Sequence, residues 1–173
     1  MAKIPVEEKA SYLRAAVFAA NDGIITTFAV VAGAAGASFN VGVVIILGFA
    51  NLLADGFSMA SGSYLGTKSE IEYERKKGKK NDKQGTPLAQ GIVTFIAFNI
   101  AGLLPLLPYV SGTPYKFEMS AIVVAFALFS VGAIRGYFIG KNIIKTGVET
   151  LIVGGFAAFV AFTTGEILKR YIL

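Results

Sequence analysis

Five long apolar segments dominate the sequence, and they limit what the chain can fold into. They span residues 11–36, 40–66, 87–110, 119–141 and 147–168. Each is about as long as an α-helix must be to cross the hydrocarbon core of a bilayer. A soluble domain of 173 residues has too large a surface-to-volume ratio to bury five helices that are apolar on all sides. We therefore expect an all-α integral membrane protein with five transmembrane helices.

The composition agrees with a membrane protein and narrows the possible chemistry. Hydrophobic residues make up 54% of the chain and charged residues only 16%, against roughly 25% in soluble domains. Cysteine and histidine are both absent, which excludes disulfides, thiolate or imidazole metal sites and thiol nucleophiles. No Walker loop and no GxSxG motif is present. We expect that the protein is not an enzyme and has no resident cofactor.

The basic residues predict how the helices are oriented. Most of them flank the ends that would share one side of the membrane: Lys3, Lys9, Arg14, Lys68, Arg75, Lys76, Lys77, Lys79, Lys80, Lys83, Arg135, Lys141 and Lys145. Only Lys116, Lys169 and Arg170 fall on the other side. The positive-inside rule then places the N-terminus inside and the C-terminus outside. The formal net charge of +5 is explained by this topology, so we expect no nucleic-acid partner.

We expect one transmembrane transport domain over residues 1–173, with a short polar cytosolic segment at about 67–86. Glu70, Glu72 and Glu74 alternate at its start, and a run of lysines follows. The second helix is expected to continue through the glutamates up to Gly78. The three glutamates form either a solvated helix face or a loose cluster that gathers cations at the inner mouth of a pathway.

Two acidic residues, Asp22 and Asp55, lie within the first two apolar segments. A carboxylate at this depth is costly and by default marks an ion or proton pathway. Asn51, Asp55 and Met59 follow at i, i+4 and i+8 and share one helix face, and Asn21 precedes Asp22. The alternative is structural: a buried carboxyl pair that shares a proton, with Met59 as core packing. Glu149 either caps the start of the fifth helix or points into the pathway.

Two carboxylates, two amides and a thioether suit a divalent metal ion that enters and leaves. A thioether favours Fe²⁺ over Mg²⁺ or Ca²⁺, whereas a dedicated Zn²⁺ or Cu²⁺ site usually recruits His or Cys. Burial favours protonated carboxyl groups when the site is empty, and metal binding releases those protons. The same side chains are therefore able to exchange protons for metal.

Three stretches resemble the vacuolar iron transporter family. They are RAAVFAANDGIITTFAVVAGAAGA, ILGFANLLADGFSMASGSYLGTKSE and GAIRGYFIGKNIIKTGVETLIVGGFAA. The resemblance implies a homodimer with its pathway on the two-fold axis and proton-coupled export of Fe²⁺, with Mn²⁺ as a second substrate, from the cytosol. It also implies that Asp22 and Met59 carry the metal, and Asp55 matches the ADxxSM form seen in part of the family.

The chain departs from the family pattern at two places. Ser63 stands where many members have a glutamate, and about twenty polar residues replace the larger metal-binding insert of plant-type members. A separate metal-delivery partner is therefore an open alternative for iron capture. The resemblance implies the plasma membrane in a prokaryote and a vacuole-like organelle membrane in a eukaryote. Two other functions stay open: a passive divalent-cation channel and a non-transporting membrane scaffold.

Overall fold

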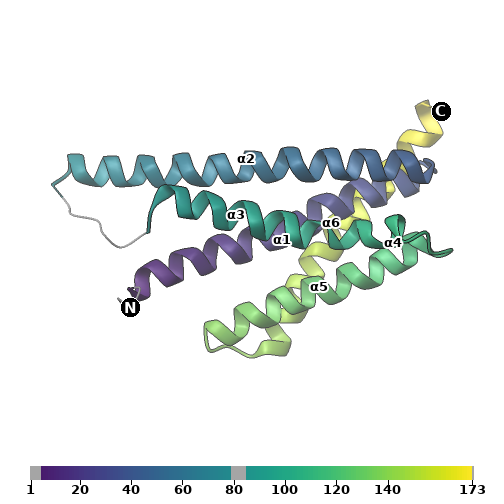
Figure 1. The fold of residues 1–173 in the computed structure, drawn as a ribbon. Helices are drawn as coiled ribbons and strands as arrows, with labels where there is room; N and C mark the ends of the chain where they lie inside the picture. Colours follow the sequence, from purple (N-terminus) through teal and green to yellow (C-terminus); the bar gives the residue numbers. More distant parts are fainter. Residues whose placement is uncertain (1–4, 79–84, 173) are drawn as a thin grey trace.

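The structure, a computed structural model, describes residues 5–78 and 85–172, and every regular element in them is helical (Figure 1). The elements are α1 (Val6–Gly36), α2 (Val41–Lys76), α3 (Pro87–Gly102), a 3₁₀ turn η1 (Leu104–Leu106), α4 (Leu107–Val110), α5 (Lys116–Phe138) and α6 (Ile143–Ile172). Five stretches are long and apolar enough to cross a membrane, with Pro87–Val110 counting as one. The expected all-α integral membrane protein is confirmed.

The direction of the helices relative to the cytosol stays a prediction. We call the end of the bundle that holds Val6, Lys76 and Phe138 the inner end, and the opposite end the outer end (Figure 1). Four of the basic residues used to assign the topology, Lys3, Lys79, Lys80 and Lys83, lie outside the described residues, as does the middle of the polar segment at 67–86.

Short polar side chains set the starts of three helices. Asn40 Oδ1 accepts a hydrogen bond from the Val43 amide at 3.0 Å, and Thr86 Oγ1 accepts one from the Ala89 amide at 3.2 Å. Asn142 Oδ1 accepts one from the Lys145 amide at 3.0 Å. Each of these side chains replaces a backbone acceptor that the first turn of a helix lacks.

The second helix is longer than a membrane span. As predicted, α2 continues through the three glutamates, ends at Lys76 and is followed by Gly78 at φ +74°. Glycine adopts this left-handed conformation without a steric cost, which suits the end of a helix.

The third segment is interrupted before its expected end. The segment 87–110, predicted as one membrane helix, is a regular helix only to Gly102, and the chain continues through η1 and α4. Proline has no amide hydrogen to donate and clashes with the preceding turn, so a regular helix does not pass through both prolines. The carbonyl of Pro105 instead accepts a 2.7 Å hydrogen bond from the buried Ser120 hydroxyl of α5.

Helix α1 is central to the bundle and contacts α2, α3, α5 and α6. It packs more extensively against α3 and α6 than against α2, the helix that follows it in the sequence. The largest fully buried side chains surround these contacts and include Ile24, Leu52, Phe98 and Leu128. The small residues at the outer end of α1 allow this arrangement, since Gly33 and Gly36 lie against the backbone of α6.

Three glycines spaced four residues apart, Gly132, Gly136 and Gly140, lie in α5 and the turn that follows it. Gly132 and Gly136 pack against Thr146 on α6, whereas Gly140 lies in the following turn at φ +68°. A Cβ added to Gly62 or Gly66 of α2 would have no atom within 4 Å, so this pair forms no helix contact within the described chain.

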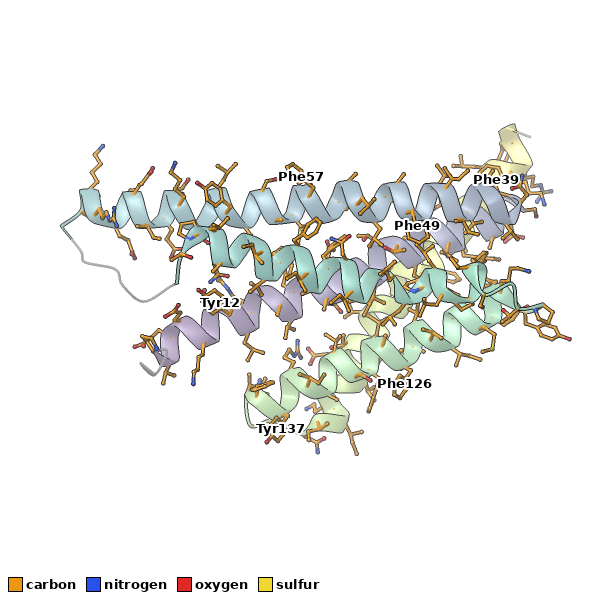
Figure 2. The ribbon with its side chains drawn as sticks, viewed as in Figure 1. Tyr12, Phe39, Phe49, Phe57, Phe126 and Tyr137 are labelled. Atoms are coloured by element: carbon orange, nitrogen blue, oxygen red, sulfur yellow. The ribbon has the colours of Figure 1, made fainter. Side chains whose placement is uncertain are left out.

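Large apolar side chains cover the outside of the bundle. Phe57 on α2 and Phe126 on α5 point away from it on different sides and are 70% and 74% exposed (Figure 2). An apolar exterior of this kind is stable in contact with lipid tails and unstable in water.

Candidate functional site

The two intramembrane acids lie on neighbouring helices near each other. Asp22 on α1 and Asp55 on α2 are both partly buried, and their carboxyl groups are close enough to interact electrostatically. The backbone carbonyl of Asp22 accepts a 2.9 Å hydrogen bond from the Thr26 hydroxyl. The two carboxyl groups therefore lie within electrostatic range of each other between two membrane-spanning helices.

A cavity of about 640 Å³ lies between α1, α2 and α3 at the inner half of the bundle. We call it the Met59 cavity. It is lined by Arg14, Ala15, Phe18, Ser58, Met59, Gly62, Ser63, Gly66, Thr67, Glu70, Gln90 and Thr94. Its walls therefore combine a thioether, hydroxyl groups, an amide, one carboxylate and the guanidinium of Arg14.

The positions of Asp22 and Asp55 along their helices relate the two aspartates to this cavity. Asp22 lies one turn outward from Phe18 on α1, and Asp55 lies one turn outward from Met59 on α2. Residues four positions apart lie on the same face of a helix. The two aspartates therefore continue the faces that line the cavity, deeper in the span.

Two amide side chains lie close to this region, one on α2 and one on α3, and the third amide considered above lies elsewhere. Asn51 is one turn outward from Asp55, and its Nδ2 is buried without a hydrogen-bond partner among the described residues. Asn99 on α3 packs its side chain on Gly56 and donates to the Phe95 carbonyl at 2.9 Å. The Asn99 Oδ1 is buried and likewise without a partner in the described part of the chain.

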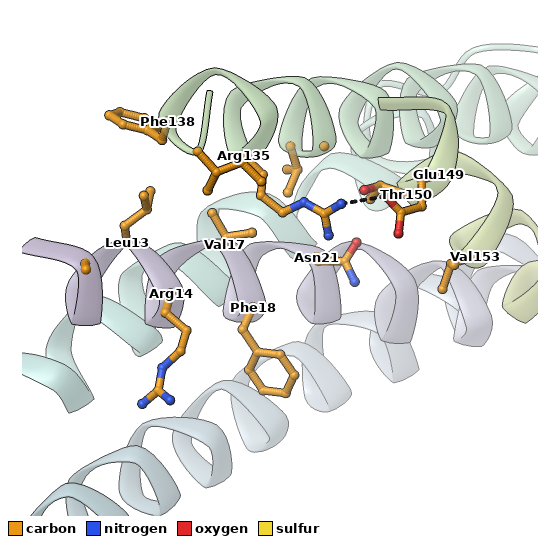
Figure 3. A pocket seen from close by; sticks show the side chains of 14 residues that line it. Leu13, Arg14, Val17, Phe18, Asn21, Arg135, Phe138, Glu149, Thr150 and Val153 are labelled. Carbon is orange, nitrogen blue, oxygen red and sulfur yellow. Dashed lines mark hydrogen bonds and ion pairs between the residues drawn. The ribbon is translucent and has the colours of Figure 1, made fainter. Parts of the chain in front are cut away.

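The third amide, Asn21, lies on a different side of α1 from the Met59 cavity. It lines a second cavity with Arg135 of α5 and Glu149 of α6 (Figure 3). There Arg135 Nη2 donates to Glu149 Oε2 at 2.8 Å. Glu149 is therefore paired with an arginine and not in the Met59 cavity, and Asn142 caps α6 in its place.

The three glutamates of α2 do not act as one cluster. Glu70 lines the Met59 cavity, and Glu74 lies one turn further along the same face. Glu72 points elsewhere and forms a 4.0 Å ion pair with Lys68 on the exposed surface. Among the described residues, no group of three His, Cys, Asp or Glu side chains is placed to hold a metal ion.

Several lining residues were missed by the sequence analysis. Arg14 was assigned to topology alone, yet it lines both cavities. Gln90 and Thr94 are buried on α3, and Gln90 Nε2 donates to Ser11 Oγ at 2.6 Å. The sequence contained a signal for Gln90 and Thr94, because they are polar residues one turn apart in an otherwise apolar helix.

A cavity of this kind is suited to a hydrated cation rather than to catalysis. Oxygen and thioether donors line its walls beside the Arg14 guanidinium, and two carboxyl groups able to bind a cation or a proton lie beyond it.

Comparison with known proteins identifies similar chains. A model of the VIT family matches residues 13–86 and 76–166. The chain is 32% identical over 165 residues to vacuolar iron transporter homolog 4 of Arabidopsis thaliana, covering 90% of this chain and 83% of that protein. It is 30% identical to homolog 1 of the same plant, covering 96% and 88% of the two chains. A vacuolar iron transporter of Toxoplasma gondii is 27% identical over 225 residues, covering 91% of this chain and 74% of that protein. These relatives are named as transporters or their homologues, not as enzymes.

Proposed function

This chain belongs to the VIT family, and we propose that it transports metal ions across its membrane. In this proposal Fe²⁺, with Mn²⁺ as a second substrate, leaves the cytosol in exchange for protons. The relatives' names support iron transport, and the side chains of this chain support the exchange.

The placement of Asp22 and Asp55, both partly buried on the contacting helices α1 and α2, is the observation that carries the proposal. Two ionised carboxylates next to each other inside a bilayer repel and are poorly solvated. A proton on each carboxylate, or one divalent cation between the two, removes this unfavourable free energy of repulsion and desolvation. Metal entry then releases protons, and protons arriving from an acidic outer compartment release metal.

The Met59 cavity supplies the route to the acids. Glu70 attracts cations at its inner part, and the Met59 thioether is the last donor before Asp55. A thioether binds Fe²⁺ better than the harder Mn²⁺. We therefore assign iron preference to Met59 and proton exchange to the two aspartates.

A second copy of the chain would complete the site. One chain offers only the aspartate pair, because the described residues contain no group of three acidic side chains. Asp55 and Asn51 are only partly buried within one copy, and α2 presents an exposed apolar face beside them. A homodimer with its pathway on the two-fold axis brings two such pairs together.

Metal and proton fluxes measured in the same vesicles test the exchange. Purified protein is reconstituted anaerobically with a pH-sensitive dye, and Fe²⁺ uptake is followed with and without a pH gradient. We expect wild-type uptake to depend on the gradient and to change the dye signal. Asp22→Asn keeps the shape and removes the charge and the proton, so it should abolish both fluxes.

Glu118→Gln is the matched control, since Glu118 is an exposed carboxylate in the first turn of α5. It should transport at the wild-type rate. Metal uptake without any dye response would indicate a passive channel, and no uptake under any gradient would indicate a scaffold. Full-rate uptake by Asp22→Asn would show that the aspartate pair does not carry the metal.

A further inference from the structure

A second cavity of about 550 Å³ lies between α1, α5 and α6 (Figure 3). We call it the Arg135 cavity. It adjoins the Met59 cavity, since Arg14 and Phe18 line both, but it contains neither Asp55 nor Met59. Transport as proposed above gives this cavity no role.

Most of the wall is apolar, and the polar groups are concentrated in one place. The apolar lining comes from all three helices and the turn after α5, and consists of Ala10, Leu13, Val17, Phe18, Val131, Phe138, Ile139 and Val153. The ion pair of Arg135 with Glu149 lies among these residues, with Asn21 facing it from α1 (Figure 3).

The polar groups of the cavity have unused hydrogen-bonding capacity. Arg135 Nε and Asn21 Oδ1 are both buried and have no partner among the described residues. An arginine has five N–H donors, and the bond to Glu149 uses only Nη2. The Arg135 and Glu149 side chains are 37% and 62% exposed, so a ligand in the cavity reaches them.

The lining carries one net positive charge, since Arg14 and Arg135 are positive and Glu149 is negative. Glu149 already neutralises Arg135, so what the cavity offers an anion is the set of Arg135 N–H donors that Glu149 does not use. Figure 3 shows the Arg14 guanidinium turned away from the ion pair, so Arg135 is the cation that faces the cavity centre. Arg135 also lies in the last turn of α5, close to the expected membrane surface.

A ligand in the Arg135 cavity must match both its apolar lining and its polar groups. An acyl chain alone leaves the exposed guanidinium N–H donors of Arg135 that Glu149 does not use without an acceptor, which is unfavourable for polar groups removed from water. A small anion alone leaves the apolar wall in contact with water. Basic pockets between membrane helices near the cytosolic surface bind acidic head groups, and lipid is the amphipathic molecule that surrounds this protein.

We propose that the Arg135 cavity binds an anionic phospholipid of the bilayer. Its phosphate accepts hydrogen bonds from Arg135, and an acyl chain packs against Val17, Val131 and Val153. The bound lipid fills the space between α1 and the α5–α6 pair at the inner end.

The absence of tryptophan from the chain allows a selective test. Val153→Trp places one fluorophore at the rim of the Arg135 cavity, and Ile122→Trp places one on the exposed lipid face of α5, where Ile122 is 63% exposed. Each protein is reconstituted in phosphatidylcholine vesicles that contain a fixed fraction of brominated phosphatidylglycerol or of brominated phosphatidylcholine. We expect severalfold stronger quenching of Val153→Trp by the anionic lipid, and equal quenching of Ile122→Trp by both lipids.

Charge variants in the Val153→Trp background separate the site from a general effect. Arg135→Gln should remove the preference for phosphatidylglycerol, and Lys169→Gln at the outer end should retain it. Glu149→Gln frees the Arg135 guanidinium and should increase the preference, which misfolding would not do. Equal quenching by the two lipids, or a preference that survives Arg135→Gln, would overturn the proposal.

Free anions are distinguished from lipid in the same vesicles. Millimolar inorganic phosphate should leave the phosphatidylglycerol preference unchanged, because it does not contact the apolar wall. If phosphate abolishes the preference, the site binds a soluble anion and the assignment to lipid is wrong.

Discussion

Gly23, the residue after Asp22, lies directly against the backbone carbonyl of Phe98 on α3. A Cβ added to Gly23 would contact the Phe98 oxygen and would lie 3.1 Å from its carbonyl carbon and 3.2 Å from its Cα. The contact is between two backbones, so no side-chain rotation relieves it. It fixes the distance between α3 and the turn of α1 that carries Asp22.

Gly23→Ala should therefore destabilise the protein by about 1–3 kcal/mol, the usual cost of overpacking a well-packed contact. Gly155→Ala is the matched control, since a Cβ at Gly155 has nothing within 4 Å. Alanine is favoured over glycine in a helix by about 1 kcal/mol, so the control should be as stable as wild type or more so. Thermal unfolding in detergent measures both, and equal melting temperatures would contradict the backbone contact.

Met59→Leu keeps the volume of the side chain and removes the sulfur. We expect Fe²⁺ transport to fall by roughly tenfold, about 1.4 kcal/mol, and Mn²⁺ transport to change much less because manganese gains little from a thioether. Competition between the two ions in the same vesicles measures the ratio. The Mn²⁺ rate is the internal control for folding, because a misfolded variant would lose both activities. An equal loss for both ions would assign Met59 to packing.

The ion pair of Glu149 with Arg135 leads to a prediction about transport. Because this carboxylate is paired and lies outside the Met59 cavity, Glu149→Gln should transport Fe²⁺ at about the wild-type rate. The pair is partly exposed, so its loss should reduce the unfolding free energy by only about 0–1 kcal/mol. Initial uptake rates and thermal unfolding are the measurements. A loss of transport comparable to that of Asp22→Asn would place Glu149 in the metal pathway.

The orientation of the bundle is tested by labelling single cysteines, since the chain has none of its own. Lys141 follows the inner end of α5 and Lys116 begins the same helix at the outer end. We expect a cysteine at Lys141 to react only with reagent on the cytosolic side and one at Lys116 only with reagent on the other side. Reaction of both from one side would contradict the five-span topology.

The five spans were predictable from the sequence because each depends on a local property, and the same property makes the two aspartates candidates for the site. A continuous apolar segment indicates a membrane helix wherever it occurs, and Asp22 and Asp55 are conspicuous inside such segments. The rotation of each helix about its axis is not local. No local pattern therefore separates Asn21 from Asp22, or pairs Arg135 with Glu149 across the α5–α6 turn.

The end of the third helix was predictable, but its packing was not. Proline ends a regular helix, and α3 stops at Gly102, just ahead of Pro105 and Pro108. Leu52 of α2 and Thr27 of α1 approach Gly102 closely, and these contacts come from segments distant in the sequence. Helix packing of this kind depends on tertiary structure and is not visible in the propensity of the residues themselves.

The contact between Gly33 of α1 and Gly165 of α6 lies at the outer end of the bundle, so a small tilt of α1 at this contact produces a larger displacement of its inner end. The two glycines touch backbone to backbone at the outer end, whereas the inner half of α1 has a cavity on two sides. Arg14 lies about 28 Å from Gly33 along the helix axis, so a tilt of about 5° at the glycine contact moves the backbone of Arg14 by roughly 2.5 Å. The Gly23 contact with the Phe98 backbone holds the same helix about 15 Å further inward, so two contacts between backbones together oppose a tilt of α1 and preserve both cavities.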